Sequence, residues 1–217
     1  VVIIGFGNTA EKTRAIYDYP DIAGDPVLSH VPRISPYLIE GPMLALPNRS
    51  KPICPVPSIG IGNKPIDGGY LLFTSDEKNE FVKAEPESSQ FFRKWIGSKE
   101  FLNGYERWCL WLGDTPPAEW RKLPKVRARV ESVAKYRRGE IPAKGKEDTA
   151  KNKKRDAGTQ KLAATPTKFH VENIPQNSYL VIPEVSSEKR TYTPIGYLGK
   201  ESLASNLVKI IPEATLY

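Results

Sequence analysis

The segment Val185–Tyr192 contains the side chains whose types and spacing are best suited to specific chemistry. Glu188 and Arg190 are two residues apart, so in an extended segment they would point the same way. An arginine can donate two hydrogen bonds to guanine O6 and N7, and a glutamate can accept one from cytosine N4. The pair could therefore read a G·C base pair, and a surface salt bridge between the two side chains is the alternative explanation.

No pattern in the sequence is typical of catalysis or of metal binding. His30 and His170 lie in loop-like contexts without a matching nucleophile or carboxylate. Cys54 and Cys109 form neither a metal-ligand pattern nor a disulfide framework, and Cys109, flanked by tryptophans, is expected to be a core thiol. The sequence also lacks an Asn-Pro-Pro-Tyr methyltransferase signature and a nuclease-type Asp…Glu-x-Lys cluster. We therefore predict a binding domain without a catalytic residue, cofactor or metal of its own.

A glycine pattern at the start of the chain suggests a different function. Gly5–Ala10 follows the apolar run Val1–Ile4 and matches G-x-G-x-x-A, the fingerprint in which backbone amides approach a dinucleotide pyrophosphate. The polar segment after it is too short for a crossover helix, and no second hydrophobic strand ending in an acid follows. A nucleotide-binding enzyme fragment therefore remains an alternative that the surrounding sequence argues against.

Positive charge is concentrated in one part of the chain. The net charge is +7, but residues 121–170 hold sixteen Lys and Arg against five Asp and Glu, whereas the other residues hold sixteen against twenty. A basic segment in an otherwise acidic chain is typical of a protein with a polyanion partner, and its binding should weaken steeply with salt. A solvated lysine-rich loop is the alternative for residues 139–158, which have the composition of a flexible insertion.

The spacing of valines predicts a basic helix over Pro124–Arg138. Val126, Val130 and Val133 follow helical spacing, and the Lys and Arg residues fall mostly off that stripe. Pro124 suits the first turn and Gly139 ends the helix. Such a helix could lie against a DNA backbone. The candidate phosphate contacts are Arg127, Arg129, Lys135, Arg137, Arg138, Lys153, Lys154 and Arg155, with Arg49, Lys51, Arg93, Lys94 and Lys99 as weaker candidates.

Twenty prolines and sixteen glycines, spread along 217 residues, favour short strands and long loops over a helix bundle. We predict an α+β fold with a mixed or antiparallel sheet, a few helices and long Pro/Gly-rich loops, above all in residues 20–69. The predicted strands are 1–6, 70–74, 107–112, 179–183, 192–197 and 206–211. The predicted helices are 77–84, 88–96, 124–138 and 200–204.

Composition and hydropathy limit the class of protein further. With 39% hydrophobic and 26% charged residues, the chain has the composition of a globular protein. No apolar run approaches the length of a membrane span, so we expect no membrane partner and a reducing, cytoplasmic setting. The apolar residues at both ends indicate a piece excised from a longer protein.

Several motifs, in order along the chain, resemble the target recognition domain of MmeI-like (type IIL or IIG) restriction–modification enzymes. They are IIGF (3–6), ISPYL (34–38), GNKPIDGG (62–69), GSKEFLNG (97–104), RWCLWL (107–112), ATPTKF (164–169), IPEVSSEKRTYTPIGYL (182–198) and IPEATLY (211–217). In this family one polypeptide carries an adenine-N6 DNA methyltransferase, which uses S-adenosylmethionine, and the domain that reads the DNA sequence.

The resemblance implies a role for the whole chain, residues 1–217. It would recognise a double-stranded DNA site, with its partners being the duplex and the methyltransferase domain of the same polypeptide. In the family, S-S-E-x-R reads bases in the major groove, which here implies Glu188 and Arg190, with Lys189 and Tyr192 as neighbours. Residues 170–177 would contribute. A protein-interaction domain that docks partner subunits and does not bind DNA is the alternative from a different class.

Overall fold

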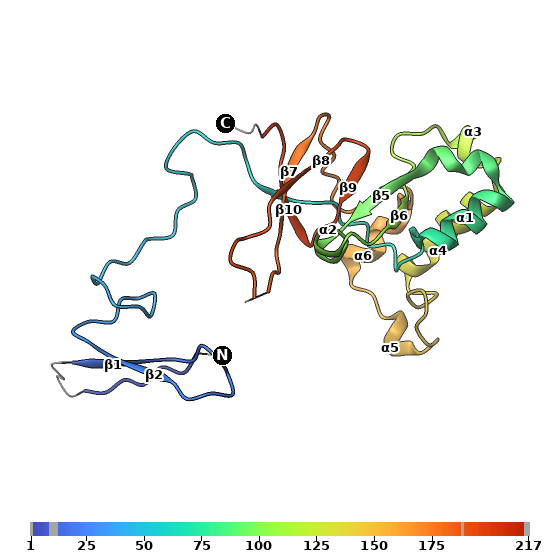
Figure 1. Cartoon of the computed structure of the whole chain (residues 1–217). Helices are drawn as coiled ribbons and strands as arrows, with labels where there is room; N and C mark the ends of the chain where they lie inside the picture. Colours follow the sequence, from blue (N-terminus) through green and yellow to red (C-terminus); the bar gives the residue numbers. More distant parts are fainter. Residues whose placement is uncertain (1, 9–12, 188, 215–217) are drawn as a thin grey trace. The chain divides into compact units, whose positions relative to one another are not determined.

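The structure, a computed structural model, describes residues 2–8, 13–187 and 189–214 (Figure 1). The chain divides into two compact units, unit 1 at residues 1–55 and unit 2 at residues 56–217. Within the described residues, no helix combines the length and the apolar character needed to cross a membrane.

Unit 1 contains one β-hairpin and a long irregular segment. Strands β1 (Arg14–Asp18) and β2 (Val27–Val31) are antiparallel, with Tyr17 directly opposite Leu28. The strand predicted over residues 1–6 is wrong for residues 2–6, which form no regular structure; Val1 lies outside the described residues. A dinucleotide fingerprint needs a helix after its glycines; residues 9–12 lie outside the described residues, and from Arg14 the chain forms β1 instead of a helix.

The first sheet of unit 2 has the strand order β4-β6-β5-β9, formed by Leu72–Thr74, Arg107–Leu110, Phe92–Ile96 and Ser202–Ala204. Its pairs are antiparallel except for the parallel pair of β5 and β9. Helices α1 (Ser75–Ala84) and α4 (Pro124–Arg138) share its core, in which Phe73, Phe81 and Phe92 pack edge-to-face. Edge-to-face aromatic contacts stabilise such a core beyond the area that they bury.

The second sheet of unit 2 is antiparallel, with the order β3-β10-β7-β8. Its strands are Gly60–Ile61, Val208–Ile211, Tyr179–Pro183 and Gly196–Leu198. A small core of its own includes Tyr179, Val181, Val208 and Ile210. The remaining helical elements are η1 (Pro86–Phe91), α2 (Ser98–Asn103), α3 (Pro117–Trp120), α5 (Ala150–Lys153), α6 (Ala157–Lys161) and η2 (Leu162–Ala164).

The α+β class and the mixed sheet are confirmed. Helix α4 has the predicted bounds, and the predicted strands at 70–74, 107–112, 179–183 and 206–211 correspond to β4, β6, β7 and β10. The predicted helix at 88–96 is wrong because residues 92–96 form β5, which pairs with β6 and with β9. The helix predicted at 200–204 is wrong because β9 there pairs with β5. Of the strand predicted at 192–197, residues 196–197 belong to β8.

Candidate nucleic-acid interface

Valines anchor helix α4 in the core, and a carboxylate caps its N-terminal end. Val126, Val130 and Val133 are buried, as their spacing predicted. The buried carboxylate of Glu85 accepts hydrogen bonds from the backbone N–H groups of Lys125 and Val126, each at 3.0 Å. Such amides in the first turn have no partner within the helix and, without Glu85, would attract an anion. Because Glu85 occupies them, a phosphate can meet this helix only along its side.

The C-terminal end of α4 contains a buried arginine that the sequence reasoning placed on the DNA-facing side. Arg137 is 0% exposed. Its five N–H donors bind five backbone carbonyl oxygens at 2.7–3.0 Å, those of Pro65, Ile66, Leu162, Thr165 and Lys168. The prediction that Arg137 contacts a phosphate is therefore wrong. The guanidinium instead ties α4 to two loops that are distant in sequence.

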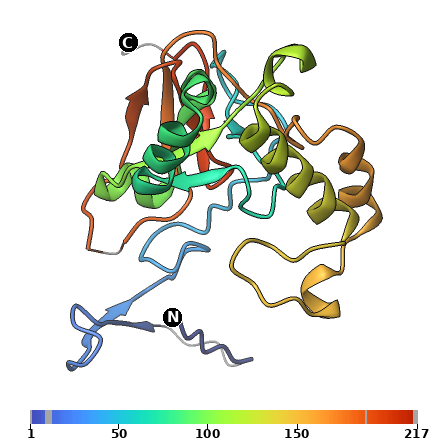
Figure 2. The ribbon, with the colours of Figure 1, turned by 90° about the vertical axis from the view of Figure 1, so that its right-hand side faces the viewer.

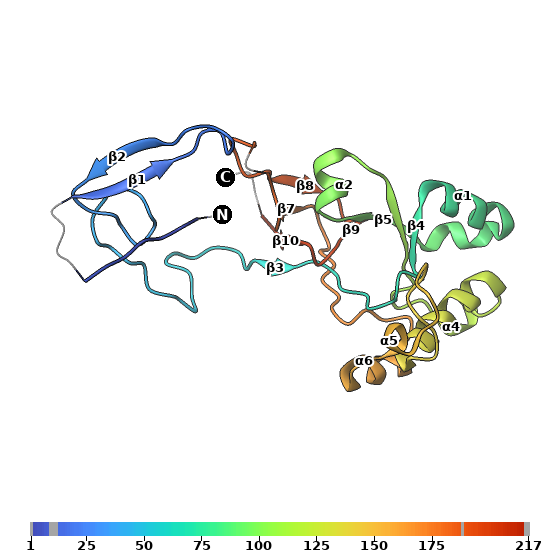
Figure 3. The same cartoon turned by 90° about the horizontal axis from the view of Figure 1, so that it is seen from below.

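Arg155 likewise serves the fold. Its guanidinium carbon lies 3.9 Å from the centroid of the Tyr136 ring, a cation–π geometry. The same group donates hydrogen bonds to the carbonyl oxygens of Tyr136, Ile141, Asn152 and Lys154. The loop between α4 and α5 is thereby held against the end of α4, and α6 packs against that helix (Figure 3). Arg155 is half-buried and four of its five N–H donors have partners, so it is less free to contact a phosphate than an exposed cation, and that role stays a prediction.

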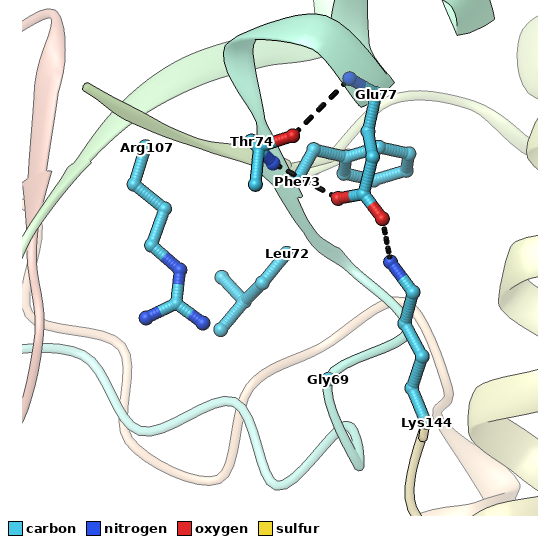
Figure 4. A pocket seen from close by; sticks show the side chains of 7 residues that line it. All are labelled: Gly69, Leu72, Phe73, Thr74, Glu77, Arg107 and Lys144. Carbon is cyan, nitrogen blue, oxygen red and sulfur yellow. Dashed lines mark hydrogen bonds and ion pairs between the residues drawn. The ribbon is translucent and has the colours of Figure 1, made fainter.

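A small pocket of about 180 Å³ shows a second connection between this loop and the first sheet (Figure 4). Lys144 donates to Glu77 Oε1 at 2.5 Å, and Glu77 also forms a capping box with Thr74 at the start of α1. These hydrogen bonds, first the one from Lys144, lower the pKa of Glu77. Sequence reasoning missed Lys144, because nothing in its surroundings indicates a partner 67 residues away.

The other predicted phosphate contacts of α4 and the adjoining loop differ in their burial and in whether they already form an ion pair. Arg129 is half-buried over the rings of Phe73 and Phe81, and burial lowers the pKa of its guanidinium. Three cations form surface ion pairs, Lys135 with Glu131, Arg138 with Glu140 and Lys153 with Asp148. Arg127 and Lys154 are exposed and form no ion pair within the described part of the chain. Surface pairs are weak enough for a phosphate to replace the carboxylate.

The predicted base-reading residues lie in the loop that joins β7 to β8. Glu188 is outside the described residues. The backbone N–H of Arg190 donates to Ser187 O at 3.0 Å, and that of Lys189 to Ser187 Oγ at 3.3 Å. The prediction that Glu188 and Arg190 point the same way in an extended segment depends on Glu188, which lies outside the described residues, so it stays a prediction. Lys189 and Arg190 are exposed, and Tyr192 is 84% exposed.

The loop between β7 and β8 and the lysine-rich segment around α5 project on the same side of unit 2. In Figures 1 and 2, which share the vertical direction, both extend downward from this unit, the loop from the second sheet and the segment around α5 at the other end of the unit. The weaker candidates Lys94 and Lys99 are exposed on β5 and α2, and Arg93 is half-buried. Arg49 and Lys51 are exposed in unit 1. Among the described residues, no group of His, Cys, Asp and Glu is arranged to hold a metal ion.

The two sheets, the exposed loop between β7 and β8 and the lysine-rich segment define the class of protein. It is an α+β binding domain that presents a loop and a basic segment on one side of its sheets. The chain belongs to the family of MmeI target recognition domains, whose family model matches residues 40–217. It is 37% identical to DNA methyltransferase A of Bacillus subtilis (strain 168) over all 217 residues, which is 22% of that relative's length. The structure is similar to that of the type IIL restriction–modification enzyme MmeI in complex with DNA, with a TM-score of 0.82 and 37% identity. That similarity covers 95% of this chain and 26% of MmeI.

Proposed function

We propose that this chain recognises a specific double-stranded DNA sequence for a DNA methyltransferase carried on the same polypeptide. The observation that supports this most is the position of the loop between β7 and β8 and of the lysine-rich segment on one side of unit 2. A DNA-reading surface needs both parts, because phosphate contacts position the protein and base contacts select the sequence. The solved relative with DNA bound adds independent support.

The finer parts of this proposal concern the longer polypeptide. The remaining part would transfer a methyl group from S-adenosylmethionine to adenine N6, in the cytoplasm, in a restriction–modification system that also cleaves DNA. The chain described here would perform neither reaction. The first test is a titration of the chain with random-sequence duplex DNA at low and moderate salt, in which fluorescence anisotropy measures the binding. Micromolar binding that disappears as salt rises supports the proposal, and no binding at low salt contradicts it for the isolated chain.

Arg190→Ala should relax the recognition of one base pair. Losing a bidentate contact to guanine costs about 1–3 kcal/mol of discrimination, roughly a 5- to 150-fold loss of affinity at the preferred site. The preferred site is first selected with the unchanged chain from a random duplex library, and the selection is then repeated with the variant. Arg190→Lys, which keeps the charge but loses the planar fork that makes the bidentate contact, is the matched control for the loss of one charge. An equal loss on all sequences would refute base reading by Arg190.

Replacing both Lys153 and Lys154 with alanine should weaken binding to all DNA sequences alike. Each phosphate contact contributes about −0.9 to the slope of log K against log [salt], so losing two would reduce the slope by up to about 2. The control replaces Arg121 and Lys122, two exposed cations that directly follow α3. If the slope stays unchanged in the test variant, the segment around α5 does not contact DNA.

A further inference from the structure

Unit 1 leaves most of its large apolar side chains in contact with solvent. Tyr17 and Leu28, directly opposite each other on β1 and β2, are 58% and 47% exposed. Others that are exposed are Tyr19, Ile22, Val27, Tyr37, Ile39 and Met43. Among the described residues of this unit, Val31 is the one large apolar side chain that is buried. A two-stranded hairpin is at best marginally stable in water, and a large exposed apolar patch is typical of an interaction site.

The charge of unit 1 argues for a protein partner and against a polyanion. Residues 1–55 contain five Lys and Arg and five Asp and Glu, so all of the chain's net charge of +7 belongs to residues 56–217. A neutral surface gains little from counterion release, which supplies much of the affinity of proteins for DNA. An apolar, neutral surface instead gains free energy mainly by burying area against another protein surface. Arg49 and Lys51 are therefore poor candidates for phosphate contacts.

The two sequence similarities differ over this part of the chain. The family model of the recognition domain begins at residue 40, after the end of β2. The similarity to DNA methyltransferase A covers all 217 residues. The hairpin is thus shared with a methyltransferase relative and lies outside the residues that the family model matches. The division of the structure after residue 55 agrees with this difference, since it separates the hairpin from both sheets of unit 2.

We propose that the hairpin of β1 and β2 is the surface on which the methyltransferase part of the same polypeptide docks. This inference rests on the proposed function in one respect, which is that the polypeptide carries a methyltransferase part. The face that carries Tyr17 and Leu28 forms the centre of the contact. Unit 1 then attaches the chain to the catalytic part, and unit 2 meets the DNA.

Hydrogen exchange tests the proposal in the full-length polypeptide that carries this chain. We expect amide exchange in residues 14–31 to be at least about tenfold slower there than in the 217-residue chain alone, because docking removes the local opening of an unsupported hairpin. Equal exchange rates in the two proteins would overturn the proposal. So would a full-length polypeptide that contains no methyltransferase part.

A double substitution identifies the docking face. In the full-length polypeptide, Tyr17→Ser together with Leu28→Ser should abolish most of that protection. The matched control, Tyr105→Ser together with Leu207→Ser, removes two similarly exposed apolar side chains from unit 2 and should leave exchange in residues 14–31 unchanged. Retained protection in the hairpin variant would show that another surface docks.

Two further measurements distinguish other occupants of this surface. If sedimentation velocity shows that the 217-residue chain dimerises and that the hairpin substitutions prevent it, the partner is a second copy and the proposal is wrong. If the same substitutions weaken DNA binding by the 217-residue chain, the hairpin contacts DNA and the proposal is wrong. Unchanged DNA binding supports it. Since DNA binding by the unsubstituted chain is measured separately, a failure of the proposed function is seen independently of the docking result.

Discussion

Replacing Arg137 with methionine should lower the free energy of unfolding by about 3–5 kcal/mol, because five carbonyl oxygens lose their hydrogen-bond donors inside the protein. Methionine keeps much of the side chain's length, so little of the loss reflects missing volume. Lysine, with three donors, can satisfy at most three of the five acceptors and should restore only part of the stability. Urea unfolding curves of the three proteins, followed by far-UV circular dichroism, measure the differences.

Arg138→Met is the control for Arg137→Met. Arg138 is the next residue of α4, but it is exposed and its partner is Glu140 at the surface. Its replacement should change the free energy of unfolding by no more than about 0.5 kcal/mol. If the two methionine variants lose similar stability, the buried hydrogen bonds of Arg137 contribute little. If Arg137→Met is stable but has a reduced salt slope for DNA binding, Arg137 would have to reach a phosphate after all.

The contrast between these neighbours shows what sequence periodicity can predict about α4. The valine stripe fixed the register of the helix correctly, because burial of Val126, Val130 and Val133 depends on spacing alone. Helical spacing also places Arg137 on that stripe, seven residues after Val130 and eleven after Val126, so the assumption that its charge keeps it at the surface was what failed. A charge can be buried when every donor finds an acceptor. Those acceptors come from residues 65–66 and 162–168, and no local pattern predicts that these loops converge on α4.

The errors in secondary structure have a similar origin. Residues 88–96 contain Phe91, Phe92, Trp95 and Ile96, a spacing that fits one face of a helix. The structure divides this segment into η1 and β5, because β5 completes hydrogen-bond ladders with β6 on one side and β9 on the other. The partner β9 is more than a hundred residues away in sequence. Non-local strand pairing therefore overrode the local preference.

The candidate site was predictable in its parts and not in its arrangement. Charge composition identified the lysine-rich segment, and the family motif identified the loop between β7 and β8. That these two segments project on the same side of unit 2 depends on how the two sheets are joined. The joint lies at Gly62 and Asn63, where the end of β3 meets the end of β9. The backbone N–H of Asn63 donates to Ala204 O at 2.7 Å, and Asn63 Nδ2 donates to the same oxygen at 3.0 Å.

Gly62→Ala should destabilise this joint by about 3 kcal/mol, the upper part of the range for overpacking, because the new methyl group meets backbone that cannot rotate away. An ideal Cβ on Gly62 would lie 2.3 Å from Ser205 O and 2.5 Å from Ala204 O. To relieve these contacts β3 must move away from β9, which stretches the hydrogen bonds of Asn63 to Ala204. Hydrogen exchange should therefore quicken at Asn63 and along β9 and β10, and the urea midpoint should fall.

Gly60→Ala separates this clash from a general effect of losing a glycine. Gly60 is in β3, two residues before Gly62, but the nearest atom to its ideal Cβ is Asn173 Nδ2 at 3.0 Å, the end of a side chain that can move. Its replacement should change the free energy of unfolding by no more than about 1 kcal/mol. Because the joint sets the position of the second sheet relative to the first, Gly62→Ala should also weaken binding to the preferred DNA site more than binding to random DNA. Similar effects of the two substitutions on both stability and site preference would mean that the close approach at Gly62 does not determine how the sheets are joined.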